Sequence, residues 1–420
     1  MGAPAGARAE ISPGGHRMAK LLPTGELVED QSTGRLALFD MAFRPFFLLG
    51  AILSVVSLSL WASTLSGHLE LVVYGGTLWW HAHEMLFGFV VAIVVGFLLT
   101  AVKTWTGQPA FHGASLTGLV LLWLCGRLFL MLPDTLPQWL IAATDLAFLP
   151  VAAVILARPV VRVKQWRNII FVPLLLAMTA ANTIMHWAAY HNDPVIQHQA
   201  ATTMVLLITL LMTIMAGRVV PMFTANGTST KKVEPKAWLE KTALVSMLLA
   251  IVASLDLPAA PPVAASLCFI FAAVVHSVRA ARWRIWVTFK TPLVWSLHLS
   301  YWCIPLGLLL YGLRGLLPAV SSSQAIHALT VGAMGMMILA MISRVSLGHT
   351  GRPIVVGKVM TVAFALFFVG FIVRVFGIYW YSNYTSLIVT AAVLWTVGYG
   401  CFIALYLPML VRPRVDGKPG

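Results

Sequence analysis

Long apolar runs, each separated from the next by a short polar segment, constrain this chain more than any other feature. Each run has about 20 residues, the length that an α-helix needs to cross roughly 30 Å of hydrocarbon. None alternates polar and apolar residues as membrane β-barrel strands do. The sequence therefore predicts an all-α, polytopic membrane helix bundle of about twelve transmembrane helices, whose backbone polar groups are satisfied within each helix. The runs are 43–64, 84–102, 113–132, 136–157, 168–190, 195–216, 238–256, 260–277, 292–313, 324–343, 358–378 and 386–410.

The composition agrees with a lipid environment. Of the 420 residues, 59% are hydrophobic and only 10% are charged, whereas about a quarter are charged in ordinary soluble domains. The net charge of +14 does not indicate a nucleic-acid-binding protein, because the basic residues lie in short loops and form no continuous face.

Polar ends flank the apolar region. We expect a polar cytoplasmic N-terminal tail at 1–42, a twelve-helix membrane domain at 43–410 and a cytoplasmic C-terminal tail at 411–420. The N-terminal tail contains no apolar core of signal-peptide length, so we expect no cleaved leader.

Basic residues are concentrated in every second loop, and Arg314 is the exception among the alternate loops. Positive charge is retained on the cytoplasmic side, so this alternation predicts that both termini are cytoplasmic. It also supports an even number of helices, although run 238–256 begins with Glu240 and run 260–277 begins with Pro261 and Pro262. The internal basic loops contain Arg158, Arg162, Lys164 and Arg167; Lys231, Lys232, Lys236 and Lys241; Arg279, Arg282, Arg284 and Lys290; and Arg352 and Lys358.

The second, sixth and tenth runs resemble one another. Each begins near histidine at the outer face and ends at a basic residue, which precedes a turn containing Gly and Thr. Three four-helix units in sequence would give this pattern, but helices of one bundle start alike for other reasons too. The starting residues are His81 and His83, His198, and His327, and the basic residues are Lys103, Arg218 and Arg344.

The densest group of ionisable residues lies in the stretch WWHAHEMLFGF, at 79–89. Ionisable residues in a membrane span are expensive and mark candidate functional sites. On a helix His81 and His83 point about 200° apart, so one is a candidate to bind a metal or haem while the other faces a loop or a second cofactor. Glu84 is a candidate to orient His81, as carboxylates do for metal-binding imidazoles. The alternative is an interfacial belt of histidines beside tryptophans.

A second group joins the fifth and sixth runs, where Asp193 and Pro194 form a turn. A short helical hairpin brings its two outer ends together, and neutral imidazoles suit copper or another borderline metal. A polar outer loop with ordinary interfacial histidines is equally consistent with the pattern. The histidines are His186, His191 and His198.

Other polar residues lie at the same depth. His327 opens the tenth run and is a further candidate ligand. Arg127 and Arg374 either bind haem propionates, because Arg binds carboxylates in a two-pronged fork, or pair with Asp145 and backbone carbonyls. His298, within the ninth run, fits an interhelical hydrogen bond better than a ligand role.

Four stretches carry a resemblance to a known family. They are LFDMAFRPFFLLGA from Leu38, WHAHEMLFGFVVAIVVGFLLTAVKTWTGQP from Trp80, AGRVVPMFTANG from Ala216 and HALTVGAMGMMILAMISRVSLGHTGRP from His327. In these stretches the chain resembles the NnrS family of bacterial membrane proteins. The resemblance implies a twelve-helix inner-membrane protein that contains haem and copper and is associated with denitrification and the response to nitric oxide. It does not supply a reaction or a ligand assignment.

Depth and chemistry suggest that assignment. We expect haem between the second and tenth spans near the outer face, and copper in the hairpin between the fifth and sixth spans. The residues expected around haem are His81 or His83 as one axial ligand, His327 as the other, and Arg374 beside the propionates. The residues expected to bind copper are His186, His191 and His198.

The resulting hypothesis is a haem- and copper-binding inner-membrane protein that acts in the nitric oxide response or in nitrosative-stress resistance, in the context of denitrification. Its partners would be nitric oxide or a related small molecule and the lipid bilayer, while any electron donor or partner protein stays open. A secondary transporter, a metal exporter and a metal-delivery factor for another enzyme are the alternatives. No P-loop, dinucleotide fingerprint, HExxH or GxSxG element supports a hydrolase or NTPase, and whether the protein is an enzyme stays open.

Overall fold

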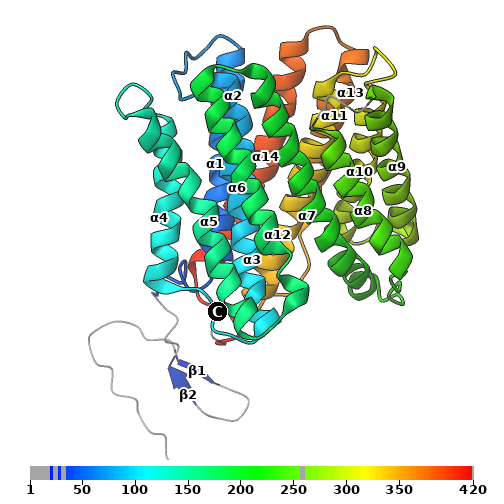
Figure 1. Ribbon diagram of the computed structural model, residues 1–420. Helices are drawn as coiled ribbons and strands as arrows, with labels where there is room; N and C mark the ends of the chain where they lie inside the picture. Colours follow the sequence, from blue (N-terminus) through cyan, green and yellow to red (C-terminus); the bar gives the residue numbers. More distant parts are fainter. Residues whose placement is uncertain (1–18, 22–26, 30–34, 256–260, 419–420) are drawn as a thin grey trace, which may run out of the picture.

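Long helices that run in alternating directions build the computed structural model (Figure 1). It describes residues 19–21, 27–29, 35–255 and 261–418. The spans are α1 (Phe43–Leu65), α2 (Thr77–His83) with η1 (Glu84–Val90) and α3 (Val91–Thr106), α4 (Gly113–Leu130), α5 (Gln138–Arg162), α6 (Phe171–His191), α7 (Pro194–Thr228), α8 (Ala237–Ala253), α9 (Pro262–Arg282), α10 (Pro292–Leu313), α11 (Ser322–His327) with η4 (Ala328–Gly335) and α12 (Met336–His349), α13 (Lys358–Phe376) and α14 (Tyr384–Val411).

Short elements complete the described chain. Three are 3₁₀ turns: η2 (Trp166–Asn168), η3 (Ile285–Val287) and η5 (Gly377–Tyr379). Strands β1 (Ala19–Leu21) and β2 (Leu27–Glu29) pair antiparallel ahead of the first helix. Most of the predicted tail at 1–42, and with it the expectation about a leader, lies outside the described residues.

The predicted all-α, polytopic membrane bundle is confirmed. In the part of the chain that the structure describes, eleven helical spans have at least 18 residues and are apolar enough to cross a membrane. The remaining long helix, α8, has 17 residues and packs against α7 and α9. Its acidic residue, Glu240, is tolerated because it forms an ion pair with Arg279 of α9.

The first and last helices meet at one end of the bundle. The Ala37 N–H donates to the Val411 carbonyl at 2.9 Å, and the Arg44 guanidinium donates to the carbonyls of Leu410 and Arg412 at 2.9 and 2.7 Å. A chain that starts and ends at the same face crosses an even number of times, so α8 completes twelve crossings.

The twelve helices define two ends of the bundle. At the histidine end, α2, α7 and α11 begin and α6 finishes. At the opposite end, here the basic end, the chain carries the basic loops between α5 and α6, between α7 and α8, and between α9 and α10. In Figure 1, α2 lies at the top of the view and the C-terminus at the bottom.

Two predicted boundaries differ from the structure more than the others do. The second span begins at Thr77 and not at 84, because Gly75 and Gly76 break the chain with φ values of 72° and 79° and the polar residues that follow are packed inside the bundle. The sixth span continues to Thr228 and not to 216. At about 1.5 Å per residue, a helix of this length reaches well beyond the hydrocarbon.

Two spans contain a π-helical segment, a feature that often marks functional sites. The segment η1 follows His83 directly, and η4 follows His327 directly. Side chains from other helices donate to backbone carbonyls of both segments. Trp123 Nε1 donates to the Gly88 carbonyl at 3.1 Å, and the Tyr399 hydroxyl donates to the Gly335 carbonyl at 2.7 Å. The sixth span is continuous α-helix and does not share this feature. The predicted repeat of three four-helix units therefore stays a prediction.

Candidate functional site

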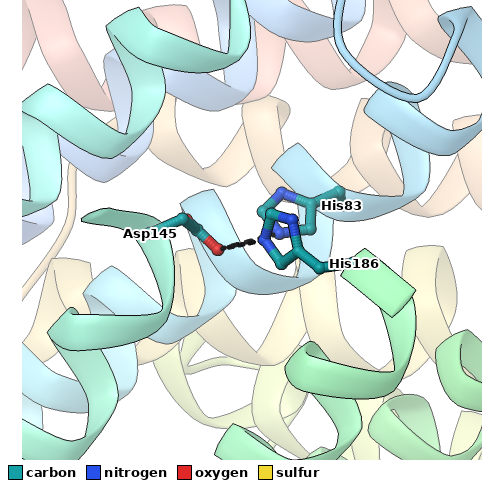
Figure 2. Close-up of side chains that lie close together, drawn as sticks. All are labelled: His83, Asp145 and His186. Atoms are coloured by element: carbon teal, nitrogen blue, oxygen red, sulfur yellow. Dashed lines mark hydrogen bonds and ion pairs between the residues drawn. The ribbon is translucent and has the colours of Figure 1, made fainter. Parts of the chain in front are cut away.

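A carboxylate at the histidine end contacts two imidazoles from different helices. Asp145 Oδ2 of α5 lies 3.1 Å from His83 Nε2 of α2 and 3.0 Å from His186 Nε2 of α6. All three side chains are almost completely shielded from solvent. Figure 2 shows the three side chains pointing toward one another from their three helices. We call these residues the His83–Asp145–His186 cluster.

A network of polar side chains stabilises the buried carboxylate. Arg127 of α4 forms ion pairs with Asp145 and with Glu84, where its Nη1 lies 2.7 Å from Glu84 Oε1. Asn182 Nδ2 donates to Asp145 Oδ2 at 2.7 Å, and Asn182 Oδ1 lies 2.9 Å from His83 Nε2. The network thus brings two carboxylates, Glu84 and Asp145, against one guanidinium. A buried carboxylate is costly to ionise unless a cation lies beside it.

Aromatic side chains enclose the cluster. The Trp79 ring stacks on His83 with centroids 4.4 Å apart, and its Nε1 donates to the Met185 carbonyl at 2.9 Å. The Tyr74 hydroxyl, in the loop between α1 and α2, lies 3.5 Å from His186 Nδ1. Burial raises the pKa of Tyr74, so its phenol stays protonated at neutral pH. These rings hold the imidazoles in place and exclude water.

The donor set of the cluster fits a metal ion. One atom from each of the three residues lies within 4.8 Å of the others. Two ligands bound at about 2.0–2.1 Å with tetrahedral angles are about 3.3 Å apart. The contacts from Asp145 Oδ2 to the two imidazoles, at 3.0–3.1 Å, are close to this spacing. Two imidazoles and a carboxylate suit copper, zinc or iron rather than magnesium or calcium.

Two other predicted histidines lie nearby in a separate group. The His81 ring stacks on Trp61 with centroids 4.5 Å apart, and its shielded Nδ1 has no hydrogen-bond partner among the described residues. His327 and Arg374 contact each other through Nε2 and Nη2 at 3.2 Å. All three side chains lie on the parts of α2, α11 and α13 at the histidine end of the bundle. We call His81, His327 and Arg374 the His81–His327 group.

The hydrogen bonds of His327 fix its tautomer. Its Nδ1 lies 2.7 Å from the Ser323 carbonyl, which can only accept, so Nδ1 carries the proton and Nε2 presents a lone pair. This is the arrangement in which metal-ligating histidines are held by a backbone carbonyl. Arg374 Nη2 also contacts Ser323 Oγ at 3.1 Å, and its Nη1 contacts the Tyr384 hydroxyl at 3.2 Å. The Nε2 lone pair therefore accepts from the Arg374 guanidinium, a group that can also bind a carboxylate.

The histidines of the hairpin between α6 and α7 do not converge in the structure. His186 joins the His83–Asp145–His186 cluster. His191 is exposed, stacks on Trp187 and contacts the Trp187 carbonyl through Nδ1 at 2.9 Å. His198 is also exposed and lies 3.3 Å from Ser322 Oγ of α11. The structure thus separates the three residues that the sequence grouped.

Several polar partners differ from, or add to, the sequence expectations. Glu84 lies 3.5 Å from His83 Nδ1 and binds Arg127, and no described contact joins it to His81. Asp145 was expected only as a partner of Arg127, and that ion pair is confirmed. Asn182 was missed, although an amide inside an apolar run was a signal that could have found it. The expected interhelical bond of His298 is confirmed, with Thr224 Oγ1 2.8 Å from its Nε2.

These features define a class: a polytopic helical membrane protein with a buried His–Asp–His cluster that could hold a metal ion. The family model described as NnrS protein matches residues 37–414. The chain therefore belongs to the NnrS family, as the motifs predicted, and this membership links it in general terms to the response to nitric oxide. A comparison with curated proteins finds no match.

Proposed function

We propose that this protein binds haem and copper in the bacterial inner membrane and acts in nitrosative-stress resistance, in the context of denitrification. The observation that carries the proposal is the presence of two separate groups of imidazoles at one end of the bundle, one beside a carboxylate and the other beside a guanidinium. Family membership supplies the link to nitric oxide.

In this proposal copper occupies the His83–Asp145–His186 cluster. The two imidazoles and the carboxylate would be its ligands, and Arg127 and Asn182 would hold the carboxylate in place. Two carboxylates beside one guanidinium favour a further cation there. This assignment moves His83 from the haem to the copper and leaves His191 and His198 outside the metal site.

Haem would lie in the His81–His327 group. His81 and His327 would be the residues that hold the haem, the Ser323 carbonyl would orient His327, and Arg374 would bind a propionate. When bound, haem iron supplies a binding site for nitric oxide, and copper supplies one-electron redox chemistry. The residues around both groups would hold the imidazoles in fixed tautomers and keep water away.

The proposed orientation places the basic end in the cytoplasm and the histidine end on the outer side. Basic loops are retained on the cytoplasmic side during insertion, and the basic loops lie at the end where α1 begins and α14 finishes. Both described ends of the membrane domain would then face the cytoplasm.

The functional test is a deletion strain challenged with nitric oxide. We expect slower growth than the parent under nitric oxide, restored by the natural protein and by His191→Ala, whose side chain lies outside both groups. His83→Ala and His327→Ala should restore growth poorly at equal membrane abundance. Equal growth of mutant and parent, under both oxic and anoxic conditions, would count decisively against the proposed role.

A further inference from the structure

A cavity of about 510 Å³ lies at the basic end, remote from both histidine groups along the helices. The segment just before α6, the second half of α7, the loop between α7 and α8, and the facing parts of α8 and α9 enclose it. Its charged lining residues are Arg167, Arg218, Lys232, Arg279 and Glu240. The four cationic side chains face a single carboxylate, so three positive charges are left uncompensated by the lining. Like charges collected in one cavity favour an anionic ligand.

Two of the four cationic side chains, Arg218 and Arg279, are held in place before any ligand binds. Arg218 Nη1 donates to Asn168 Oδ1 at 2.8 Å, and its guanidinium lies over the Phe171 ring at 5.2 Å. Arg279 donates to the Thr213 carbonyl at 2.9 Å and to the Tyr301 hydroxyl at 3.0 Å. Binding an anion therefore costs little ordering of these side chains.

The one carboxylate does not neutralise the cavity, because Glu240 is already paired with Arg279. Gly217 of α7 makes this pair possible. A Cβ atom at Gly217 would lie 2.9 Å from Glu240 Oε2 and would overlap the Arg279 guanidinium. Arg167, Arg218 and Lys232 have no carboxylate partner among the described residues, and they are left to attract an anion from outside.

A second cavity of about 390 Å³ shares Lys232 with the first and extends the basic surface. Lys231, Arg282 and Arg284 line it. The buried Arg284 Nε finds no acceptor in the described chain, and Arg284 adopts a left-handed conformation with φ 60°. Backbone strain of this kind often persists at binding sites. A buried N–H without an acceptor also indicates a missing ligand group.

We propose that these joined basic cavities bind a phosphate-bearing ligand. Phosphate oxygens accept charge-assisted hydrogen bonds from Arg and Lys, and basic pockets between transmembrane helices on the cytoplasmic side are suited to phospholipid headgroups. The first cavity also has apolar lining, including Ile214 and Leu244, which would contact an apolar portion of the ligand. The phosphate can belong to an anionic phospholipid or to a soluble molecule.

The test compares two variants that each remove two exposed positive charges at the basic end. Arg167→Gln with Lys232→Gln changes the cavity, whereas Arg158→Gln with Lys358→Gln changes exposed residues outside both cavities. Detergent-purified protein is titrated with inorganic phosphate by calorimetry at constant ionic strength. In parallel, native mass spectrometry measures retained lipid after transfer from nanodiscs of phosphatidylglycerol or of phosphatidylcholine.

We expect one probe to bind the natural protein saturably and the cavity variant at least about tenfold more weakly, because two charge-assisted contacts are lost. The control variant should bind like the natural protein. Selective retention of phosphatidylglycerol assigns the site to lipid headgroups, and saturable binding of phosphate assigns it to a soluble ligand. The proposal is overturned if neither probe binds, or if the two variants behave alike.

Discussion

The spans α2–η1–α3 and α11–η4–α12 are built alike but have opposite surroundings. In each, a histidine ends a short α-helix, a π-helical segment follows at once, and a glycine lies five residues beyond the histidine, at Gly88 and Gly332. Yet His83 contacts a carboxylate paired to a guanidinium, whereas His327 contacts the Arg374 guanidinium itself.

This difference shows that the same backbone arrangement, a short α-helix followed by a π-helical segment, can position a histidine in two kinds of site. A carboxylate beside an imidazole favours a bound cation, and a guanidinium beside an imidazole favours a group that carries an anion. The electrostatic partners come from other helices: Asp145 from α5 and Arg374 from α13. The span positions the histidine, and the charged side chains of neighbouring helices determine which kind of ligand the histidine can bind.

The largest effect on stability should follow from removing the carboxylate of the His83–Asp145–His186 cluster. Asp145→Ala leaves the buried Arg127 short of a partner and breaks the contacts to both imidazoles. Loss of one partner from a buried ion pair costs about 3–5 kcal/mol. We therefore expect a clearly lower apparent Tm in detergent, and a smaller loss for Asp145→Asn, which keeps the shape and a hydrogen-bonding oxygen.

His191→Ala is the control for this prediction, because an exposed side chain typically changes stability by about 0.5 kcal/mol or less. An Asp145→Ala protein that unfolds at the same temperature as His191→Ala would show that the carboxylate does not stabilise the cluster.

A smaller effect should follow from crowding the first π-helical segment. A Cβ at Gly88 would lie 2.8 Å from Arg127 Nη1 and 3.0 Å from Glu84 Oε2, so Gly88→Ala presses on this ion pair. Overpacking typically costs about 1–3 kcal/mol, which outweighs the gain of up to about 1 kcal/mol from replacing a helical glycine. We expect a lower apparent Tm and weaker retention of copper.

Gly400→Ala is the matched control, because nothing lies within 4 Å of a Cβ there. It should leave the apparent Tm unchanged or slightly raised. If both alanine variants gained stability equally, the tight approach of Arg127 and Glu84 to Gly88 would be wrong.

The fold was largely predictable because hydropathy and loop charge act locally along the chain. Apolar runs predicted the spans, and the basic loops supported an even number of crossings even though Glu240 weakened the seventh run. The helical rotation between His81 and His83 also predicted that they face different partners, as they do. The π-helical segments could not be predicted, because the contacts that Trp123 and Tyr399 make with their carbonyls come from other helices.

The residues of the His83–Asp145–His186 cluster were harder to predict, because the cluster forms only where three helices converge. Asp145 and Asn182 lie 37 residues apart, and the sequence gives no signal that they meet. The prediction that the histidines of the hairpin between α6 and α7 converge was wrong for a geometric reason. Five residues along an α-helix rotate a side chain by about 140°, so His191 turns away from the interior that His186 faces.

The most direct measurement is the haem and copper content of His81→Ala and His83→Ala, purified as monodisperse protein beside the natural chain. These two residues are neighbours in sequence but belong to different groups. We predict that His83→Ala loses most of its copper and keeps its haem, while His81→Ala loses haem and keeps copper. Loss of the same cofactor from both variants, or full retention of both cofactors in each, would contradict the separation of the two sites.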